Sequence, residues 1–495
     1  MKKNNNTSNT AQAFWIGLGS LFSFMFSIVS AAILSRFLTK ADYGTYKQVM
    51  YVYSTLLSVF TLGLPLAYSY FLPRVGLSEG KALVSKLNIC FIIQGIVFSS
   101  VLFLGAGVIA NILKNPDLES VLKVFSPAPI FILPTMGLQG ILATYQKTIW
   151  NAAYTILSST FMLLCVAIPV SFLRAEVDVA IWGFIVASFI SCGVAMIIMN
   201  IPFRGVIREQ TRVSYKDIFS YSIPLMIAGL LGVSISAADQ FYVSRFFGQE
   251  VFADFANGSL ELPFVGMVLS AGSAVLLPVF SRMIANHENE DSIIELWKRT
   301  AVKAAYILYP LVSFCIFFAT EIMTFLYGQN YAASGLYFRI MLMVNFFTVI
   351  QFYPIILALG KTKQYAFNHI IIFFLVWGLE YGAVMIFNTA YAVTIVSVCC
   401  KIFKIFLMMN LVAHTIHVKF ITLFPFKQLL SVFACCVFSG AVSYFVVICM
   451  GVSNLLIVLI IGFLLFAIFC YLLGRIMKID YLEVIRPLTS KLIKR

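Results

Sequence analysis

Fourteen runs of about 20 or more mostly apolar residues follow one another along the chain, and each is long enough for an α-helix to cross the hydrocarbon core of a bilayer. In that core only helices and closed barrels satisfy their backbone hydrogen bonds. The pattern predicts an all-α integral membrane protein with about 14 transmembrane helices. The predicted spans lie near residues 12–34, 46–72, 84–110, 121–142, 149–172, 178–200, 218–242, 256–281, 301–325, 337–359, 365–388, 390–413, 428–450 and 453–475.

The composition agrees with a chain that has lipid as its main solvent. Hydrophobic residues make up 61% of the sequence and charged residues 11%, whereas soluble domains average about 45–50% and about 25%. The net charge of +14 suggests nucleic acid as a partner, but the Lys and Arg residues lie in short loops between apolar runs. We therefore expect membrane lipids as partners and no nucleic acid.

The positive charges predict the orientation of the spans. Of the 34 Lys and Arg residues, 24 fall in segments on the side of both termini, 8 on the opposite side and 2 within the twelfth span. Because loops rich in Lys and Arg stay on the cytoplasmic side, we expect a multi-pass protein with both termini in the cytoplasm.

The loops leave little room for catalysis or a metal. The longest, residues 201–217 and 282–303, are too short for an extramembrane catalytic domain, so we expect no enzyme. The 10 cysteines show no C-x-x-C spacing and support neither a zinc site nor a disulfide framework. His414 and His417 are more typical of a headgroup boundary than of a metal site. We expect neither metal nor cofactor.

One short segment occurs twice. Ser35–Val49 reads SRFLTKADYGTYKQV, and Ser244–Gly258 reads SRFFGQEVFADFANG, 209 positions later. Weaker echoes follow in the same order, from Ile109 to Ile322 and from Ile141 to Ile356. Together they predict a duplicated six-helix unit. Because six is even, both copies enter the membrane the same way up, as a parallel repeat with a substrate site between two lobes.

The predicted domains follow from this repeat. Residues 1–205 form an N-terminal six-helix lobe, residues 206–425 a second lobe, and residues 426–495 two further helices with a basic cytoplasmic tail.

The second span carries the clearest candidate for a substrate-facing surface. Its polar residues recur every three or four positions and would share one helical face, which we interpret as wet. In the first span, Ser20, Ser23, Ser27 and Ser30 have the same spacing, but close helix packing through small residues explains them better. The face of the second span comprises Lys47, Tyr51, Ser54, Ser58, Thr61, Pro65 and Tyr68.

Charged residues in or near the spans complete the set of candidates. Arg36, Asp239, Arg245 and Glu261 lie near the predicted outer boundary, where solvated helix ends are the alternative. A charge at the membrane centre costs about 2.5–3.5 kcal/mol on insertion scales and needs a partner or an aqueous cavity. Glu380 in the eleventh span and Lys401 in the twelfth therefore form either a structural ion pair or part of a transport path. Lys404 also lies in the twelfth span.

These segments resemble a known family. ILSRFLTKADYGTYKQV, AADQFYVSRFFGQEVFADFANGS with its acidic Asp239, and FLYGQNYAASGLYFRI are similar to stretches of the polysaccharide and O-antigen flippases. These flippases belong to the multidrug/oligosaccharidyl-lipid/polysaccharide (MOP) exporter superfamily, which includes the MATE transporters. The resemblance implies two lobes around a central, often cationic, cavity lined by helices 1, 2, 7 and 8. The eighth span is less polar here than that assignment implies.

The resemblance also implies a function. The expected activity is alternating-access transfer of an undecaprenyl-diphosphate-linked oligosaccharide to the outer leaflet of the bacterial cytoplasmic membrane, for O-antigen, capsule or exopolysaccharide biosynthesis. Polysaccharide polymerase and assembly proteins are the implied partners, and the glycan itself stays open. No nucleotide-binding motif occurs, so direct use of ATP is not expected. The membrane potential would favour outward movement of the anionic diphosphate. A proton or sodium gradient that acts through Asp239 or Glu261 is the alternative energy source.

Two other functions fit a multi-pass membrane protein less well. An ion-coupled multidrug or cation exporter of the same superfamily would usually keep acidic groups in its first lobe, and the first two predicted spans contain no Asp or Glu. An integral-membrane glycan polymerase or transferase would need a sizeable outer loop, which the short loops disfavour.

Overall fold

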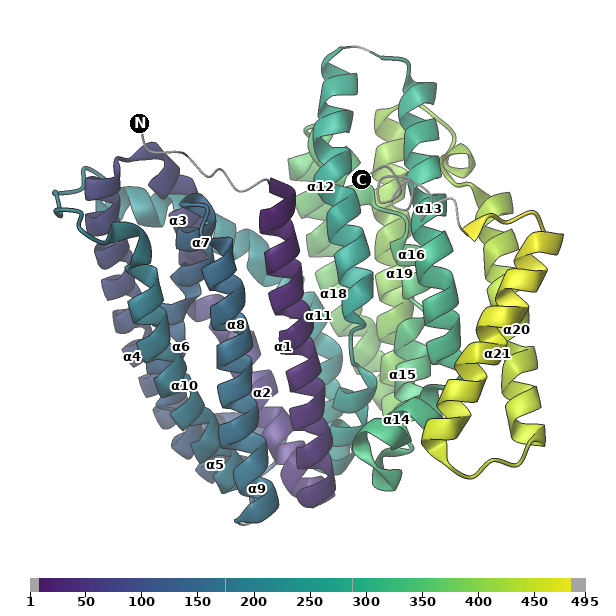
Figure 1. Cartoon of the computed structure of the whole chain (residues 1–495), viewed down its shortest axis with the longest axis horizontal. Coiled ribbons are helices and arrows are strands. Elements are labelled where there is room, and N and C mark those ends of the chain that lie inside the picture. Colours follow the sequence, from purple (N-terminus) through teal and green to yellow (C-terminus); the bar gives the residue numbers. More distant parts are fainter. Residues whose placement is uncertain (1–8, 174, 287, 482–495) are drawn as a thin grey trace, which may run out of the picture. The chain divides into compact units, whose positions relative to one another are not determined.

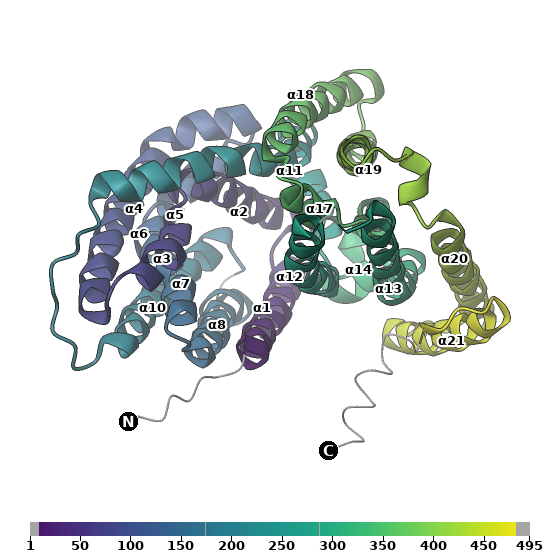
Figure 2. The same ribbon diagram turned by 90° about the horizontal axis from the view of Figure 1, so that it is seen from above.

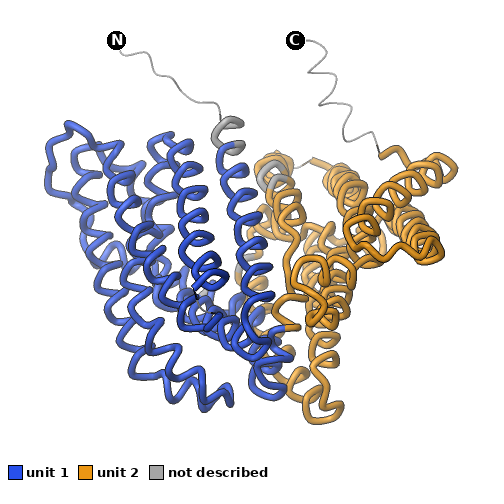
Figure 3. The backbone as a smooth tube through the Cα atoms, turned by 60° about the horizontal axis from the view of Figure 1, so that its bottom comes forward, with its two compact units in different colours: residues 1–253 blue, residues 254–495 orange. Residues whose placement is uncertain are grey.

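The computed structural model describes residues 9–173, 175–286 and 288–481, and in these residues the chain forms helices and no strand. It divides into two compact units, residues Met1–Ala253 and Asp254–Arg495, which Figure 3 shows in blue and orange. The predicted all-α membrane fold is confirmed.

Unit 1 is built around long helices that pack side by side. In Figure 1, α1 lies against α8 and α8 against α10, while α4 packs on α5 and α6. Phe60, Phe98 and Tyr53 stack in its interior, with ring centroids 4.5 and 6.1 Å apart. Its helices are α1 (Asn9–Phe37), α2 (Lys40–Phe60), α3 (Leu64–Phe71), α4 (Leu77–Leu113), α5 (Asp117–Phe125), α6 (Ala128–Ile132), α7 (Leu138–Thr144), α8 (Thr148–Met162), α9 (Ile168–Phe172), α10 (Val177–Met199) and most of α11 (Tyr215–Gly258).

Unit 2 contains the remaining helices. The hairpins α18–α19 and α20–α21 are each formed by neighbours in sequence, as Figure 2 shows from above. The last pair packs on α13 through an apolar cluster around Phe318, Val447 and Val458. The helices are α12 (Pro263–Ala285), α13 (Glu290–Phe317), α14 (Ala319–Tyr327), α15 (Ser334–Leu342), α16 (Asn345–Thr348), α17 (Phe352–Ala358), α18 (Thr362–Phe387), α19 (Ala390–Thr415), α20 (Phe426–Cys449) and α21 (Leu455–Ile476).

Each predicted span coincides with a helix or a group of helices, but the count of fourteen is not confirmed. Among the described residues, 11 helices are long and apolar enough to cross a membrane, or 13 if two bent pairs each count as one span. The eighth predicted span corresponds to α12.

The second predicted span is not one straight helix. Leu62 and Gly63 adopt positive φ angles of 47° and 68°, and α2 and α3 meet at a bend of 45°. The expectation that one polar face runs from Lys47 to Tyr68 is therefore wrong, because the helical register is interrupted after Thr61. A similar bend of 41° separates residues 334–348 from α17.

The two copies of the duplicated segment share one local structure. In the first copy, α1 ends at Phe37 and α2 begins after Thr39, whose hydroxyl accepts a hydrogen bond from the Asp42 N–H. In the second copy, α11 breaks at Gly248, which aligns with Thr39. The aligned aromatic residues Tyr43 and Phe252 are both fully buried. This helix–break–helix arrangement at matching positions agrees with a duplication.

The compact units divide inside α11, between Ala253 and Asp254. The proposed lobes 1–205 and 206–425 and the C-terminal region 426–495 stay predictions. Several basic residues used for the orientation, namely Lys2, Lys3, Arg174 and the tail residues Arg486, Lys491, Lys494 and Arg495, lie outside the described residues.

Candidate functional site

Four residues of the polar face predicted on the second span, Lys47, Ser54, Ser58 and Thr61, lie on α2 or directly after it, and their contact with substrate stays a prediction. Lys47 is half-buried, and its ammonium lies 5.2 Å from the centroid of the Tyr43 ring. Ser54 is exposed, whereas Ser58 and Thr61 are half-buried. The three hydroxyls each donate to a carbonyl three residues earlier in the same helix, at 3.0, 2.6 and 3.3 Å. Their oxygens keep lone pairs with which they can accept hydrogen bonds from a ligand.

The two tyrosines of the predicted face lie inside unit 1. Tyr51 is 8% exposed and donates to the Ala237 carbonyl of α11 at 3.2 Å. Tyr68, on α3 beyond the bend, is fully buried, and its hydroxyl lies 2.6 Å from Asn88 Oδ1. Both hydroxyls make hydrogen bonds inside unit 1. Their roles as ligand-binding residues stay predictions.

Four polar side chains form a buried cluster at the junction of α2, α4 and α11. Asn115 Nδ2 donates to Thr45 Oγ1 at 3.0 Å and to Gln48 Oε1 at 2.6 Å, and Gln48 Nε2 donates to Ser244 Oγ at 2.8 Å. All four residues are at most 4% exposed. We call Thr45, Gln48, Asn115 and Ser244 the buried polar cluster. In a dry interior such hydrogen bonds hold three helices in one arrangement.

Further contacts join α11 to the same region. The Arg245 guanidinium donates to the Ile112 carbonyl at the end of α4. Phe252 lies against Tyr51, with ring centroids 6.0 Å apart. Gly44 approaches Gln249 so closely that a β-carbon on Gly44 would overlap the Gln249 carbonyl. The two copies of the duplicated segment therefore meet directly at Gly44 and Gln249.

Asp239 and Arg36 are placed differently from each other. Asp239 is buried in α11, and its Oδ1 accepts a hydrogen bond from the Gln240 N–H at 2.8 Å. Arg36 is exposed in the last turn of α1. Of the first-span serines, Ser23 meets Ser159 of α8 at 2.9 Å, as close helix packing requires.

Unit 2 has a polar contact at the position that matches Thr45. Asp254, which aligns with Thr45, accepts a hydrogen bond from Ser334 Oγ at 3.2 Å. Ser334 lies six residues after the positive-φ Gly328, so it is not at the position that matches Asn115 in the repeat. The duplicated segment of each unit nevertheless makes a polar contact with a later segment of the same unit.

The other predicted charges belong to unit 2. Glu261 is exposed in the loop before α12 rather than at the start of that helix. Glu380 is fully buried in α18, and Lys401 and Lys404 are half-buried in the adjacent α19. The two roles predicted for Glu380 and Lys401, a structural ion pair or part of a transport path, stay predictions. Among the described residues, no group of three or more His, Cys, Asp or Glu side chains could hold a metal ion.

The buried polar cluster was not predicted from the sequence. Ser244 and Thr45 lie inside the duplicated segment, and Asn115 lies in the first echo, so the repeat did mark the right segments. The side-chain pairing had no sequence signal, because its hydrogen-bonded partners lie up to 196 positions apart.

Comparison with known proteins gives one sequence family. The profile of a family described as polysaccharide biosynthesis proteins matches residues 33–335. No curated protein matches the chain significantly.

Solved structures give the fold. The lipid II flippase MurJ in an inward closed conformation shares 14% identity, with a TM-score of 0.65 over 92% of this chain and 98% of that chain. An inward-facing multidrug resistance MATE transporter of the MOP superfamily shares 14% identity, with a TM-score of 0.63 over 81% and 98%. A MOP superfamily transporter from Pyrococcus furiosus shares 13%, with a TM-score of 0.57 over 82% and 94%. The fold is of the MOP type, and the resemblance predicted from the sequence is confirmed.

Proposed function

We propose that this chain, which belongs to the polysaccharide biosynthesis protein family, moves an undecaprenyl-diphosphate-linked oligosaccharide from the cytoplasmic to the outer leaflet of a bacterial cytoplasmic membrane. The observation that carries the proposal is the combination of this family with a multi-pass fold that is similar to the lipid II flippase MurJ. The protein would be a transporter and not an enzyme. Both termini would lie in the cytoplasm.

Energetics explain why such a substrate needs a protein. A hydroxyl without a hydrogen bond in hydrocarbon costs about 2–7 kcal/mol, so a sugar chain does not cross a bilayer unaided. A polar path through the protein removes most of that cost while the polyprenyl tail stays in lipid.

The α2 face offers suitable groups for the head of this substrate. Serine and threonine oxygens at Ser54, Ser58 and Thr61 can accept hydrogen bonds from sugar hydroxyls. A diphosphate is anionic and pairs with Lys or Arg, for which Lys47 at the same face and Arg36 nearby in sequence are the candidates. Five further residues stay candidates for substrate binding, in states of the transport cycle in which α2 and α11 are separated. They are Asp239, Arg245, Glu261, Tyr51 and Tyr68.

In this proposal the buried polar cluster closes one side of the protein during alternating access. With its hydrogen bonds formed, it holds α2, the end of α4 and α11 together at the end of unit 1 that we assign to the outer leaflet. Opening toward that leaflet would break the link between Gln48 and Ser244. Since the cluster contains no charged side chain, the cost of separating it stays modest.

No cofactor is proposed. An inside-negative potential favours outward movement of an anionic head by about 2.3 kcal/mol per charge per 100 mV, if no compensating charge moves with it. A proton or sodium gradient acting through Asp239 or Glu261 is the alternative energy source. Polysaccharide polymerase and assembly proteins are the proposed partners.

The α2 face can be tested by export. Replacing Lys47 or Arg36 by Ala should lower export of the glycan without loss of the protein from the membrane. Lys123→Ala is the matched control, because this exposed lysine forms only an i,i+4 pair with Glu119, and such pairs contribute little. Normal export by both test variants would remove the anionic-head part of the proposal.

Deletion of the gene tests which class of substrate the protein transports. Deletion of the gene should leave a lipid-linked glycan on the cytoplasmic leaflet, and identifying that glycan would name the substrate. The second candidate, an ion-coupled drug or cation exporter, is disfavoured because no Asp or Glu occurs in α1 or from Tyr43 to Leu72. Accumulation of a cationic drug in the deletion strain, with normal glycan export, would favour it instead.

A further inference from the structure

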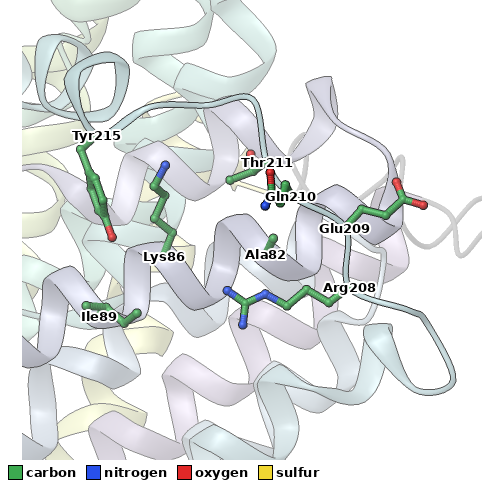
Figure 4. Close-up of a pocket in the computed structure, with 8 residues that line it drawn as sticks. All are labelled: Ala82, Lys86, Ile89, Arg208, Glu209, Gln210, Thr211 and Tyr215. Carbon is green, nitrogen blue, oxygen red and sulfur yellow. The ribbon is translucent and has the colours of Figure 1, made fainter.

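A pocket in unit 1 lies at the end of α4 opposite to the buried polar cluster. It has a volume of about 480 Å³ and lies between the first turns of α4 and the segment that leads into α11 (Figure 4). It is lined by Ala82, Lys86, Ile89, Arg208, Glu209, Gln210, Thr211 and Tyr215. None of these residues is among the predicted site residues.

The walls of the pocket are held together by hydrogen bonds between distant parts of the chain. Lys86 Nζ donates to the Val213 carbonyl at 2.7 Å, and Lys81 Nζ to the Val206 carbonyl at 2.8 Å. Glu79 Oε1 accepts from the Arg212 N–H at 2.7 Å and from Thr211 Oγ1 at 3.1 Å. The segment 206–213 is therefore fastened along the start of α4, although about 130 residues separate the two in sequence.

The pocket presents two cations. The Lys86 ammonium lies 4.5 Å from the centroid of the Tyr215 ring and uses one of its three N–H donors for Val213. In Figure 4 the Arg208 guanidinium points back toward α4, while the Glu209 carboxylate points away from it, and Lys86 and Arg208 both line the pocket. Arg208 forms no hydrogen bond or ion pair within the described ranges. Its five donors are available to an oxyanion.

The position of the pocket along α4 is that of a membrane surface. Lys86 is the last charged residue before an uncharged stretch from Leu87 to Leu113, long enough to cross the hydrocarbon core. Tyr215 is half-exposed, as tyrosines at a membrane interface commonly are. The pocket thus lies at headgroup level.

An apolar track leads out of the pocket. Ile89 lines the pocket, and Ile93 and Ile96 follow on the same face of α4, at 47%, 56% and 51% exposure. This face of the helix would lie against acyl chains. A ligand that fits both features has an anionic phosphate head and a hydrocarbon tail.

We propose that this pocket binds the phosphate group of an anionic lipid, with Lys86 and Arg208 pairing with the phosphate and Ile89, Ile93 and Ile96 contacting the chain. Basic pockets at the end of membrane helices bind such headgroups by the same chemistry. The proposal does not depend on the transport function, because it uses residues apart from the α2 face. The phosphate belongs either to a bilayer phospholipid or to a polyprenyl phosphate.

The test measures lipid binding to the full-length protein in detergent by native mass spectrometry. Phosphatidylglycerol should bind more tightly than phosphatidylcholine, and Arg208→Gln should weaken it about fivefold, the contribution of one basic residue near a membrane surface. Arg204→Gln and Arg212→Gln are matched controls, because they remove the same charge from the same segment outside the pocket. Glu209→Gln should leave binding unchanged or tighten it.

Further measurements identify the source of the phosphate and test the lipid proposal itself. Stronger binding of a polyprenyl phosphate than of phosphatidylglycerol, lost in Arg208→Gln, would support the carrier lipid; the reverse order would support a bilayer phospholipid. Binding of inorganic diphosphate with no selectivity among lipids would overturn the lipid proposal. Equal losses in Arg208→Gln and in both control variants would also overturn it, since a general surface charge would then explain the binding. Lys86→Gln should weaken lipid binding about as much as Arg208→Gln does. It also removes the hydrogen bond from Lys86 to the Val213 carbonyl, which can lower the stability of the protein.

Discussion

Replacing Gln48 by Met tests whether the buried polar cluster holds α2, α4 and α11 together. Methionine keeps most of the volume of glutamine but offers no amide, so the bonds to Asn115 and Ser244 are both lost. Ser244 is fully buried and Asn115 is 1% exposed, so water does not replace the missing partner. Each buried polar group left unpaired costs about 1–3 kcal/mol. We expect a total loss of at least about 2 kcal/mol.

The assay is thermal unfolding of the purified protein in detergent. For a cooperative unit of 150–250 residues, each kcal/mol lowers the melting temperature by about 2–4 °C, so Gln48→Met should lower it by about 4–8 °C. Ser244→Ala alone should also destabilise, because it leaves the Gln48 Nε2 donor unpaired. The double variant should cost less than the sum of the two, since removal of both partners of a buried hydrogen bond is far less harmful than removal of one.

Gln94→Met is the matched control. Gln94 is also buried in unit 1, but its amide oxygen and nitrogen have no hydrogen-bond partner in the described part of the chain. The same substitution should therefore be neutral or stabilising there. Two results would contradict this role of the cluster. One is a melting temperature of Gln48→Met equal to that of the wild type. The other is a loss of stability in the double variant equal to the sum of the losses in the two single variants.

Three further substitutions test the junctions of unit 1. Gly44→Leu should destabilise the protein, measured by thermal unfolding, because its side chain would overlap the Gln249 carbonyl; retained stability would contradict the close approach of the two duplicated segments. Gly63→Ala should cost about 1–3 kcal/mol, because φ is 68° and a β-carbon would lie 2.6 Å from the Ser222 carbonyl. The same variant should lower glycan export if the bend between α2 and α3 matters for transport. Tyr68→Phe removes the 2.6 Å bond to Asn88 and should cost about 0.5–1.5 kcal/mol, with no loss of export if Tyr68 only packs; a clear export defect at normal stability would instead support a substrate role.

The bend at Leu62 and Gly63 could not be predicted from the spacing of polar residues. Periodicity placed Lys47 and Tyr68 on one face because it assumed a continuous helix from 46 to 72. A glycine followed two residues later by a proline, at Gly63 and Pro65, signals a helix break, but not its angle or which side chains it buries. Tyr68 therefore points into unit 1 instead of continuing the polar face of α2.

The chain's membrane character and helical content were fixed by hydrophobicity alone, because apolar runs of this length have no other stable fold in lipid. The sequence repeat likewise predicted the duplication. In the structure, the helix is interrupted at the matching position of each copy, Thr39 and Gly248. Tertiary structure alone decided that Gln48, Asn115 and Ser244 share hydrogen bonds and that Lys86 and Arg208 face one pocket. Such pairings join residues 67 to 196 positions apart, and no local rule of spacing or propensity records which of many distant polar groups will be brought together.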